Sequence, residues 1–183
     1  MAYSSGVERP EQDHLDRIAE QWARERPDLD VSALATMGRL FRVAELAHVE
    51  LGLGLRGYKL PPGWFDVLAA LRRAGPPFEL TPTALMHAMM LSSGGVTKRL
   101  DRLAEARLLT RRPDPDDRRG VLVRLTARGR QLIDRALAEH VANEEEVLGT
   151  LSLAEQRRLD DLLRRLLARL EHEVDPVKRP SGG

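Results

Sequence analysis

The sequence predicts a mainly α-helical protein that carries one small β-hairpin. Apolar residues recur three and four positions apart over most of the 183 residues, which is the period of a helix that buries one face. Residues 109–125 instead show two short β-type runs joined by a polar turn. The stretch from Ser92 to Arg130 holds 11 Lys and Arg against 5 Asp and Glu, a net charge of +6, whereas the whole chain is only +1. This concentration of positive charge predicts an element that binds a polyanion, most simply DNA.

Composition limits the classes of protein that the chain can belong to. There is no cysteine, which excludes disulfides, thiol catalysis and cysteine-based zinc sites. Aromatic residues, at 4%, are too sparse to stack the bases of a single strand. No apolar run approaches membrane-spanning length, and the N-terminus lacks the apolar core of a signal peptide. We therefore expect a cytoplasmic protein without a membrane partner.

Residues 13–62 are predicted to form two helices, after a flexible leader at residues 1–12. Asp13 suits the N-cap of the first helix, and Asp28 or Asp30 suits that of the second. Apolar positions of the second helix alternate three and four apart, at Leu34, Met37, Phe41, Ala44, His48, Leu51 and Leu55. This spacing predicts a seam for a neighbouring helix, in the same chain or in a partner, and makes His48 a core or interface residue rather than a metal ligand.

Residues 63–126 are predicted to form a DNA-binding domain. Thr81 and Pro82 begin a short helix, with Thr as the N-cap and Pro at the first helical position. A second helix follows almost at once near Leu91. Two helices joined by so tight a turn are typical of a helix-turn-helix.

The second of these helices is the expected recognition helix. Val96, Leu100 and Leu103 fall on its core face, whereas the outward side chains are short hydrogen-bonding groups and cations that suit base edges and phosphates. The residues of this helix that we expect to contact DNA are Ser92, Ser93, Thr97, Lys98 and Arg102. The alternative is a solvated amphipathic face, which accounts for the charges but not for the hairpin that follows.

The hairpin is the expected wing. Its first strand begins at Leu109, its return strand covers Val121 to Leu125, and the turn between them is too polar to be buried. Arg118 and Arg119 in this turn suit a minor groove, whose narrow width concentrates negative potential. The alternative is a turn that is merely solvated. Together the elements predict a winged helix-turn-helix with a small β-wing.

Residues 127–174 are predicted to form two long helices, followed by a disordered tail at residues 175–183. Thr126 suits the N-cap of the first, and Ser152 with Glu155 suits a capping box for the second. The last helix carries a wide leucine face that exceeds what one helix needs to pack on its own domain. With the N-terminal helices it predicts a helical dimerisation region, and hence a homodimer.

This order of elements resembles the MarR family of winged-helix transcriptional regulators, over residues 13–174. The most specific match is Asp117-Arg118-Arg119-Gly120 followed by Leu125-Thr126-Ala127-Arg128-Gly129, which resembles the wing motif D-x-R and L-T-x-x-G of that family. Gly120 stands where Ser is usual. The resemblance implies a homodimer that reads a palindromic operator in double-stranded DNA, with one recognition helix per half-site and Arg119 as the best minor-groove candidate.

A narrower resemblance is to the urate-responsive, PecS-like branch of the family, which has an additional N-terminal helix. Trp22 on the added helix, Asp66, Arg99 in the recognition helix and Arg111 on the first wing strand match that branch. The resemblance implies that Trp22 and Arg99 contact the ligand, that Asp66 lies near it, and that Arg111 holds the local charge network. Urate is a flat, polar anion, so its site needs an aromatic surface or a donor, together with a guanidinium. The alternative is a static salt bridge of Asp66 with Arg99 or Arg111, beside a Trp22 that anchors the core.

The function that follows is a DNA-binding regulator, a repressor released from its operator by a small anionic ligand such as urate or a related purine metabolite. A phenolic or other aromatic anion, or a dicarboxylate, is the alternative ligand. A metal sensor is a further alternative, but the five histidines form no i, i+4 pair, so neither a metal site nor a cofactor is predicted. The sequence shows no phosphate loop, nucleophile elbow or ordered acid–base pair, and therefore does not predict an enzyme.

Overall fold

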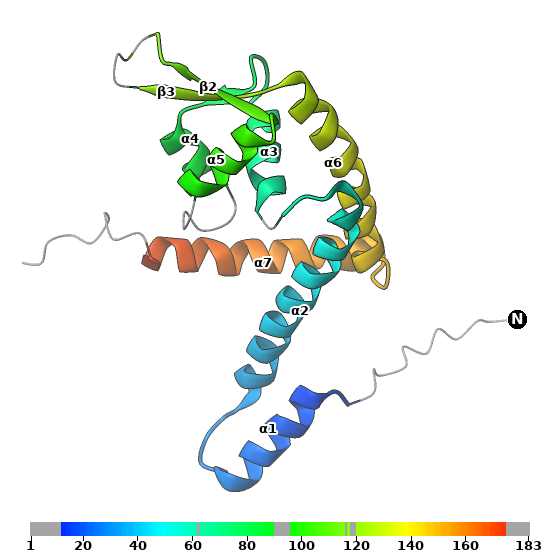
Figure 1. The fold of residues 1–183 in the computed structure, drawn as a ribbon. Helices are drawn as coiled ribbons and strands as arrows, with labels where there is room; N and C mark the ends of the chain where they lie inside the picture. The colour runs from blue at the N-terminus through cyan, green and yellow to red at the C-terminus, as the bar shows by residue number, and fades with distance from the viewer. Residues whose placement is uncertain (1–11, 62, 90–95, 116, 118–119, 175–183) are drawn as a thin grey trace, which may run out of the picture. The chain divides into compact units, whose positions relative to one another are not determined.

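The computed structural model describes residues 12–61, 63–89, 96–115, 117 and 120–174 (Figure 1). Apart from Gln12, the expected leader and the expected tail lie outside these ranges. The chain divides into two compact units, Met1–Leu53 and Gly54–Gly183. The finer division into N-terminal helices, a DNA-binding domain and C-terminal helices stays a prediction.

The first unit holds helix α1 (His14–Glu25) and nearly all of helix α2 (Ser32–Gly54). Asp13 is the N-cap of α1, because its carboxylate accepts hydrogen bonds from the backbone N–H groups of Leu15 (2.8 Å) and Asp16 (3.0 Å). The prediction of this N-cap is therefore confirmed.

Hydrogen bonds at the start of α2 show which of the two aspartates, Asp28 or Asp30, caps this helix. Asp30 accepts a hydrogen bond from the backbone N–H of Ser32 (3.0 Å), whereas the carboxylate of Asp28 pairs with the guanidinium of Arg26 (2.7 Å). Asp30 is thus the residue that satisfies a free N–H group at the start of α2.

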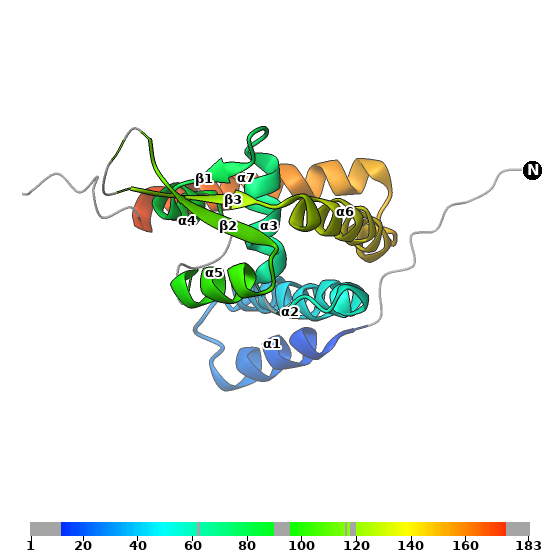
Figure 2. The ribbon, with the colours of Figure 1, turned by 45° about the horizontal axis from the view of Figure 1, so that its top comes forward.

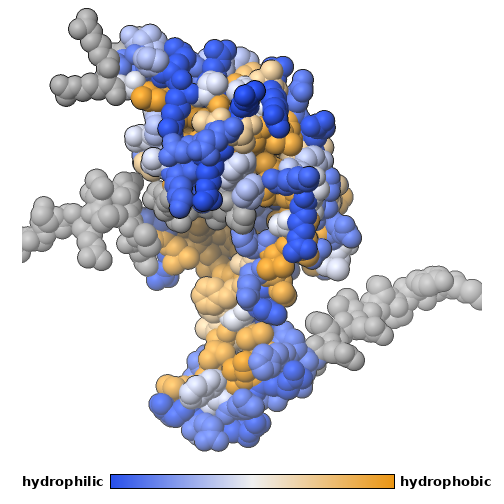
Figure 3. All heavy atoms as spheres, in the orientation of Figure 1, coloured by the Kyte–Doolittle hydropathy of each residue, from blue (hydrophilic) through white to orange (hydrophobic). Residues whose placement is uncertain are grey.

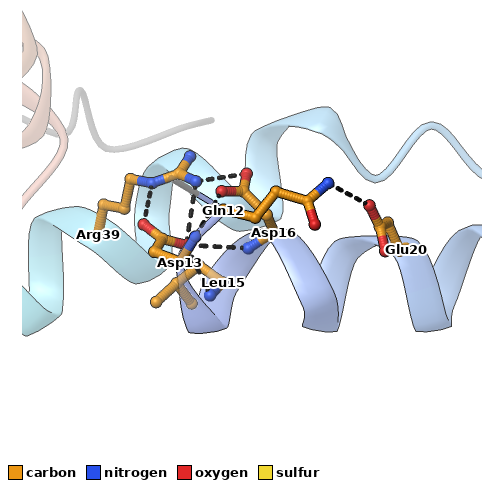
Figure 4. A network of polar contacts seen from close by, with 6 residues as sticks. All are labelled: Gln12, Asp13, Leu15, Asp16, Glu20 and Arg39. Atoms are coloured by element: carbon orange, nitrogen blue, oxygen red, sulfur yellow. Dashed lines mark hydrogen bonds and ion pairs between the residues drawn. The ribbon is translucent and has the colours of Figure 1, made fainter. Parts of the chain in front are cut away.

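A charged network joins α1 to α2 within this unit (Figure 4). Arg39 of α2 donates from Nε to the carboxylate of Asp13 (2.7 Å) and from a terminal nitrogen to that of Asp16 (2.5 Å). The Arg39 guanidinium and the backbone N–H of Asp16 together lower the pKa of Asp13 to about 2 from its ordinary value of 3.8. One arginine therefore bridges two carboxylates at the N-terminus of the added helix.

The second unit contains the remaining helices and all strands of the part of the chain that the structure describes. In chain order these are the 3₁₀ helix η1 (Leu55–Tyr58), α3 (Trp64–Arg73), β1 (Glu79–Leu80), α4 (Pro82–Ala88), α5 (Val96–Glu105), β2 (Leu109–Pro113), β3 (Val121–Leu125), α6 (Ala127–Leu148) and α7 (Leu153–Val174). The predicted helix-turn-helix corresponds to α4 and α5, and the predicted wing corresponds to β2 and β3.

The strands form an antiparallel sheet in which β3 lies between β1 and β2 (Figure 2). In the hairpin Leu109 pairs with Leu125, and Arg111 pairs with Val123. Paired residues of antiparallel strands point to the same face of the sheet, so Arg111 shares its face with the buried Val123. The sequence predicts the hairpin correctly but misses β1, because two residues are too few to show an alternating pattern.

The core of this unit lies between the sheet and helices α3, α4, α5 and α6. Its fully buried large side chains are Val67, Leu68, Leu71, Leu85, Leu100, Leu103, Leu109, Val123 and Ile133. Val96, Leu100 and Leu103 of α5 are all buried, as their spacing predicts. Burial of this face fixes which side chains of α5 remain at the surface.

The motif L-T-x-x-G joins the wing to α6 through Thr126 and Gly129. The Thr126 hydroxyl accepts a hydrogen bond from the backbone N–H of Gly129 (2.9 Å) and donates to the carbonyl of Arg107 (2.9 Å). Thr126 is therefore the predicted N-cap of α6, and it also ties α6 to the turn between α5 and β2.

Helices α2 and α7 both expose apolar side chains in the single chain. On α7 these are Leu153, Leu159, Leu162, Leu163, Leu166, Leu167 and Leu170. On α2 they include Phe41, which is 67% exposed, and apolar side chains are seen among polar ones in this part of Figure 3. Over the described residues, no helix is long and apolar enough to cross a membrane.

Candidate functional site

The outward face of α5 presents three of the side chains that we expect to contact DNA. Thr97, Lys98 and Arg102 are all exposed, while the opposite face of the helix is buried in the core. Ser92 and Ser93 lie outside the described residues. A hydroxyl and two cations on a solvent-facing helix can contact base edges and phosphates.

The described part of the wing explains why Gly occupies position 120. The backbone N–H of Asp114 donates to the Gly120 carbonyl (3.0 Å), and the N–H of Gly120 donates to the Asp117 carbonyl (2.8 Å). A Cβ at Gly120 would lie 2.8 Å from the Cβ of Asp114, so a serine there would crowd the turn. Arg118 and Arg119 lie outside the described residues, and their contact with the minor groove stays a prediction.

An ion pair between Arg112 of β2 and Glu79 of β1 links the two edge strands of the sheet on the face opposite the core. The Arg112 guanidinium donates to both carboxylate oxygens of Glu79, at 3.0 and 2.5 Å, and so reaches across β3 from one edge strand to the other. This pairing holds the pKa of the Glu79 carboxyl below its usual range. The base of the wing is thus tied to β1.

Arg111, the neighbour of Arg112, lies on the opposite face of the sheet and contacts the recognition helix. Its guanidinium lies 2.6 Å from a carboxylate oxygen of Asp101 on α5. The resemblance to the urate-responsive branch makes Arg111 part of a charge network, and the partner that the structure gives it is Asp101. Its place in a ligand site stays a prediction.

Arg99 of α5 lies against the N-terminus of α3. A Cβ at Gly63, the N-cap of α3, would fall 2.5 Å from the Arg99 Cζ, so the guanidinium rests directly on the Gly63 backbone. Gly63 has a φ of +76°, which favours glycine at this position. Asp66, half-buried in the first turn of α3, belongs to the same region.

The static salt bridge that is the alternative for Asp66 is not seen. Within the described ranges, Asp66 forms no ion pair with Arg99, Arg111 or any other residue, and Arg99 forms none either. Arg99 is therefore a half-buried guanidinium at a helix N-terminus whose charge is not matched by a carboxylate of the described chain.

Trp22 lies on α1 in the first unit, and its side chain is 48% exposed. Trp22 is therefore not one of the buried residues of the described chain, and the alternative in which it anchors the core stays a prediction. The contact of Trp22 with a ligand stays a prediction.

Sequence reasoning missed Asp101 and Glu79 as partners of the two wing arginines. Adjacent residues of a strand point to opposite faces, so the side chains of Arg111 and Arg112 lie on opposite sides of the sheet and contact different elements. That alternation was a usable signal, but the identity of each partner depends on how strands and helices pack. Within the described residues, no group of three His, Cys, Asp or Glu side chains is placed to hold a metal ion.

Comparison with known proteins agrees with this arrangement. Residues 58–120 match the MarR family. The regulator PecS of Dickeya dadantii is 42% identical over 149 residues, which cover 81% of this chain and 90% of PecS. A mutant MarR from Escherichia coli, complexed with operator DNA, superposes with a TM-score of 0.65 at 28% identity and covers 75% of this chain and 97% of that one.

A further similar structure is BpsR of Bordetella bronchiseptica, whose DNA binding is regulated by 6-hydroxynicotinic acid. It has a TM-score of 0.63 at 29% identity and covers 72% of this chain and 98% of BpsR. PecS is a transcriptional regulator and not an enzyme, in agreement with the sequence. The chain therefore belongs to the MarR family of winged-helix, DNA-binding transcriptional regulators, on the PecS-like branch.

Proposed function

We propose that the chain is a cytoplasmic repressor that binds a palindromic operator as a homodimer and is released by a flat anion, with urate or a related purine metabolite as the effector. The observation that carries the proposal is the position of Arg99. Its guanidinium rests on the Gly63 backbone at the N-terminus of α3, and it has no carboxylate partner among the described residues. A residue of the recognition helix thus offers an unmatched charge to a ligand.

The region around Arg99 has the chemistry that an anion requires. The N-terminus of a helix carries free N–H groups and a partial positive charge, both of which favour an anion. A guanidinium adds planar, paired donors that match the oxygens and nitrogens of a flat ligand. In this proposal Arg99 and Trp22 contact the ligand, Asp66 lies beside it and Arg111 belongs to the surrounding charge network.

Asp66 supplies the proposed link between ligand and DNA. An anion that enters beside a half-buried carboxylate is repelled by it, and the approach of Arg99 relieves this repulsion. Because Arg99 belongs to α5, its movement displaces the helix that carries Thr97, Lys98 and Arg102. The ligand then favours a state in which the two recognition helices no longer fit both half-sites. Ligand binding therefore lowers the affinity for DNA, and the size of this change is the coupling free energy between the two sites.

The homodimer and the DNA contacts complete the proposal. The leucine face of α7 and the apolar surface of α2 are exposed in the single chain, and a second copy would bury them. Two copies related by a two-fold axis read two half-sites of a palindrome. Each contributes Ser92, Ser93, Thr97, Lys98 and Arg102 to a major groove, and Arg118 and Arg119 to the adjacent minor groove.

A second candidate is a regulator of the same kind whose ligand is another aromatic anion. The similarity to BpsR favours this candidate, because 6-hydroxynicotinic acid is also a flat heteroaromatic acid. Urate and 6-hydroxynicotinate share planarity and negative charge, so Arg99 suits either. Calorimetric titration of the DNA-free protein with each compound distinguishes them.

The same titration tests the role of each pocket residue. We expect Arg99→Lys and Trp22→Phe to weaken urate binding about tenfold, because a lysine lacks the paired donors and a phenylalanine lacks the indole N–H. Arg128→Lys, an equivalent change on the exposed surface of α6, should leave urate binding unaltered. Asp66→Asn should retain ligand binding but reduce the release of DNA. Wild-type affinity for urate in the Arg99 and Trp22 variants would refute this site.

A further inference from the structure

Asp101 lies on the recognition helix, and its carboxylate is paired with an arginine of the wing. Its carboxylate lies 2.6 Å from the guanidinium of Arg111 on β2, and the two side chains are 48% and 37% exposed. Arg111 reaches this position because its register partner is Val123, whose buried side chain marks the helix-facing side of the sheet. The ion pair thus joins the outer part of α5 to the first strand of the wing.

The two arginines of β2 hold that strand from opposite sides. Arg111 is bound to α5 on one face of the sheet, and Arg112 is bound to Glu79 of β1 on the other. The chain itself connects α5 to β2 through a short turn in which Arg107 has a φ of +58°. A strand fixed on both faces directly after this turn has little freedom to change its angle to α5.

We infer that the Asp101–Arg111 ion pair sets the angle between the recognition helix and the wing, and that both residues are positioning residues for operator binding. A winged helix must place one element in a major groove and the other in the adjacent minor groove at the same time. The distance between the two is fixed by the DNA, so a wing that pivots on α5 loses one contact when it makes the other.

Simple electrostatics predicts the opposite effect for Asp101. An acidic side chain on the face of a helix that approaches phosphates repels them, so its removal should strengthen binding. If Asp101 instead positions the wing, its removal should weaken binding to the operator. The sign of the change therefore separates the two roles.

The test measures operator affinity of Asp101→Asn in the full-length protein without any effector, so it does not depend on which ligand the regulator binds. A partly exposed ion pair has a modest effect, and we expect about a threefold loss per protomer, hence about tenfold for a dimer on two half-sites. The matched control is Glu105→Gln, which removes an equal charge from an exposed position of the same helix and should bind as tightly as wild type or slightly more tightly. Thermal melting of each variant checks that the fold is retained.

Two further measurements distinguish positioning from a general loss of charge. In hydroxyl-radical footprints of Asp101→Asn, protection by the wing in the minor groove should weaken more than protection by α5. In a double-mutant cycle with Arg111→Gln, the double variant should bind the operator no more weakly than whichever single variant has the lower affinity. The reason is that both substitutions break the same ion pair. Unchanged or tighter binding by Asp101→Asn, or strictly additive losses in the cycle, would overturn the inference.

Discussion

Gly129 is a residue at which the motif L-T-x-x-G has little steric tolerance. A Cβ at this position would lie 2.0 Å from the Leu108 carbonyl oxygen and 2.9 Å from its carbonyl carbon. That carbonyl also accepts a hydrogen bond from the backbone N–H of Thr126 (3.1 Å), so it is not free to move away. The glycine therefore allows α6 to start directly against the turn that follows the recognition helix.

We predict that Gly129→Ala destabilises the protein by about 2–3 kcal/mol, because the added methyl group must displace backbone. Chemical denaturation followed by circular dichroism measures the change in the free energy of unfolding. Gly57→Ala is the control, since a Cβ at Gly57 would meet nothing within 4 Å. Equal stability of both variants would show that the contact with Leu108 is not rigid.

At the scale of the element, a charged network adds to the apolar contacts that attach α1 to α2. Leu15 and Ile18 of α1 are partly buried, and Arg39 of α2 binds the carboxylates of both Asp13 and Asp16. The pKa of Asp13 in the folded protein is about 2, below its unfolded value near 3.8. A carboxylate with a lowered pKa stabilises the folded state above its unfolded pKa and loses this effect as the pH falls towards the folded pKa.

We predict that α1 remains attached to α2 throughout the neutral and mildly acidic range, and that the contribution of Asp13 is lost only between pH 3.8 and about 2. An NMR titration of the Asp13 carboxyl carbon measures its pKa directly. In Arg39→Gln, the pKa should return towards 3.8 because the bridging guanidinium is gone. If the wild-type carboxyl titrates near 3.8, the network of Figure 4 does not form in solution.

The elements also show what could be read from the sequence and what could not. The N-caps at Asp13, Thr81 and Thr126 and the core face of α5 are local patterns, and all of them are found in the structure. By contrast, the partner of Arg111 and the contact of Arg99 with Gly63 arise from residues 10 to 36 positions apart. Such contacts depend on packing between elements, which periodicity does not specify.

At the scale of the whole molecule, the exposed leucines of α7 form the apolar face on which the proposed homodimer depends. We predict that Leu166→Glu converts a dimer into monomers, because a charge in an apolar interface is desolvated without a counter-ion. Sedimentation velocity measures the oligomeric state, and operator affinity should fall with it because one copy engages only a single half-site. Arg165→Glu, the adjacent change on the polar side, is the control. A Leu166→Glu protein that remains dimeric would exclude α7 from the interface.

The proposed function depends on a movement that reaches from the N-terminus of α3 to the DNA-reading face. Arg99 and Asp101 are two positions apart on α5, and the first contacts α3 while the second contacts the wing. In the proposed mechanism, a helix held at these two points would transmit a displacement of Arg99 to the elements that bind DNA. Ligand binding and operator binding would then favour different positions of the same helix.

The measurement that tests this account most directly is a gel-shift titration of the protein on the DNA upstream of its own gene, with and without urate. We predict a specific complex that urate at sub-millimolar to millimolar levels dissociates, and that persists in the Arg99→Lys variant at the same urate concentration. A complex that urate does not dissociate, but that another flat aromatic acid does, would show that the effector is different and that the proposed mechanism still holds. A protein that does not bind this DNA at all, or whose release by urate is unaffected by Arg99→Lys, would contradict the central claim.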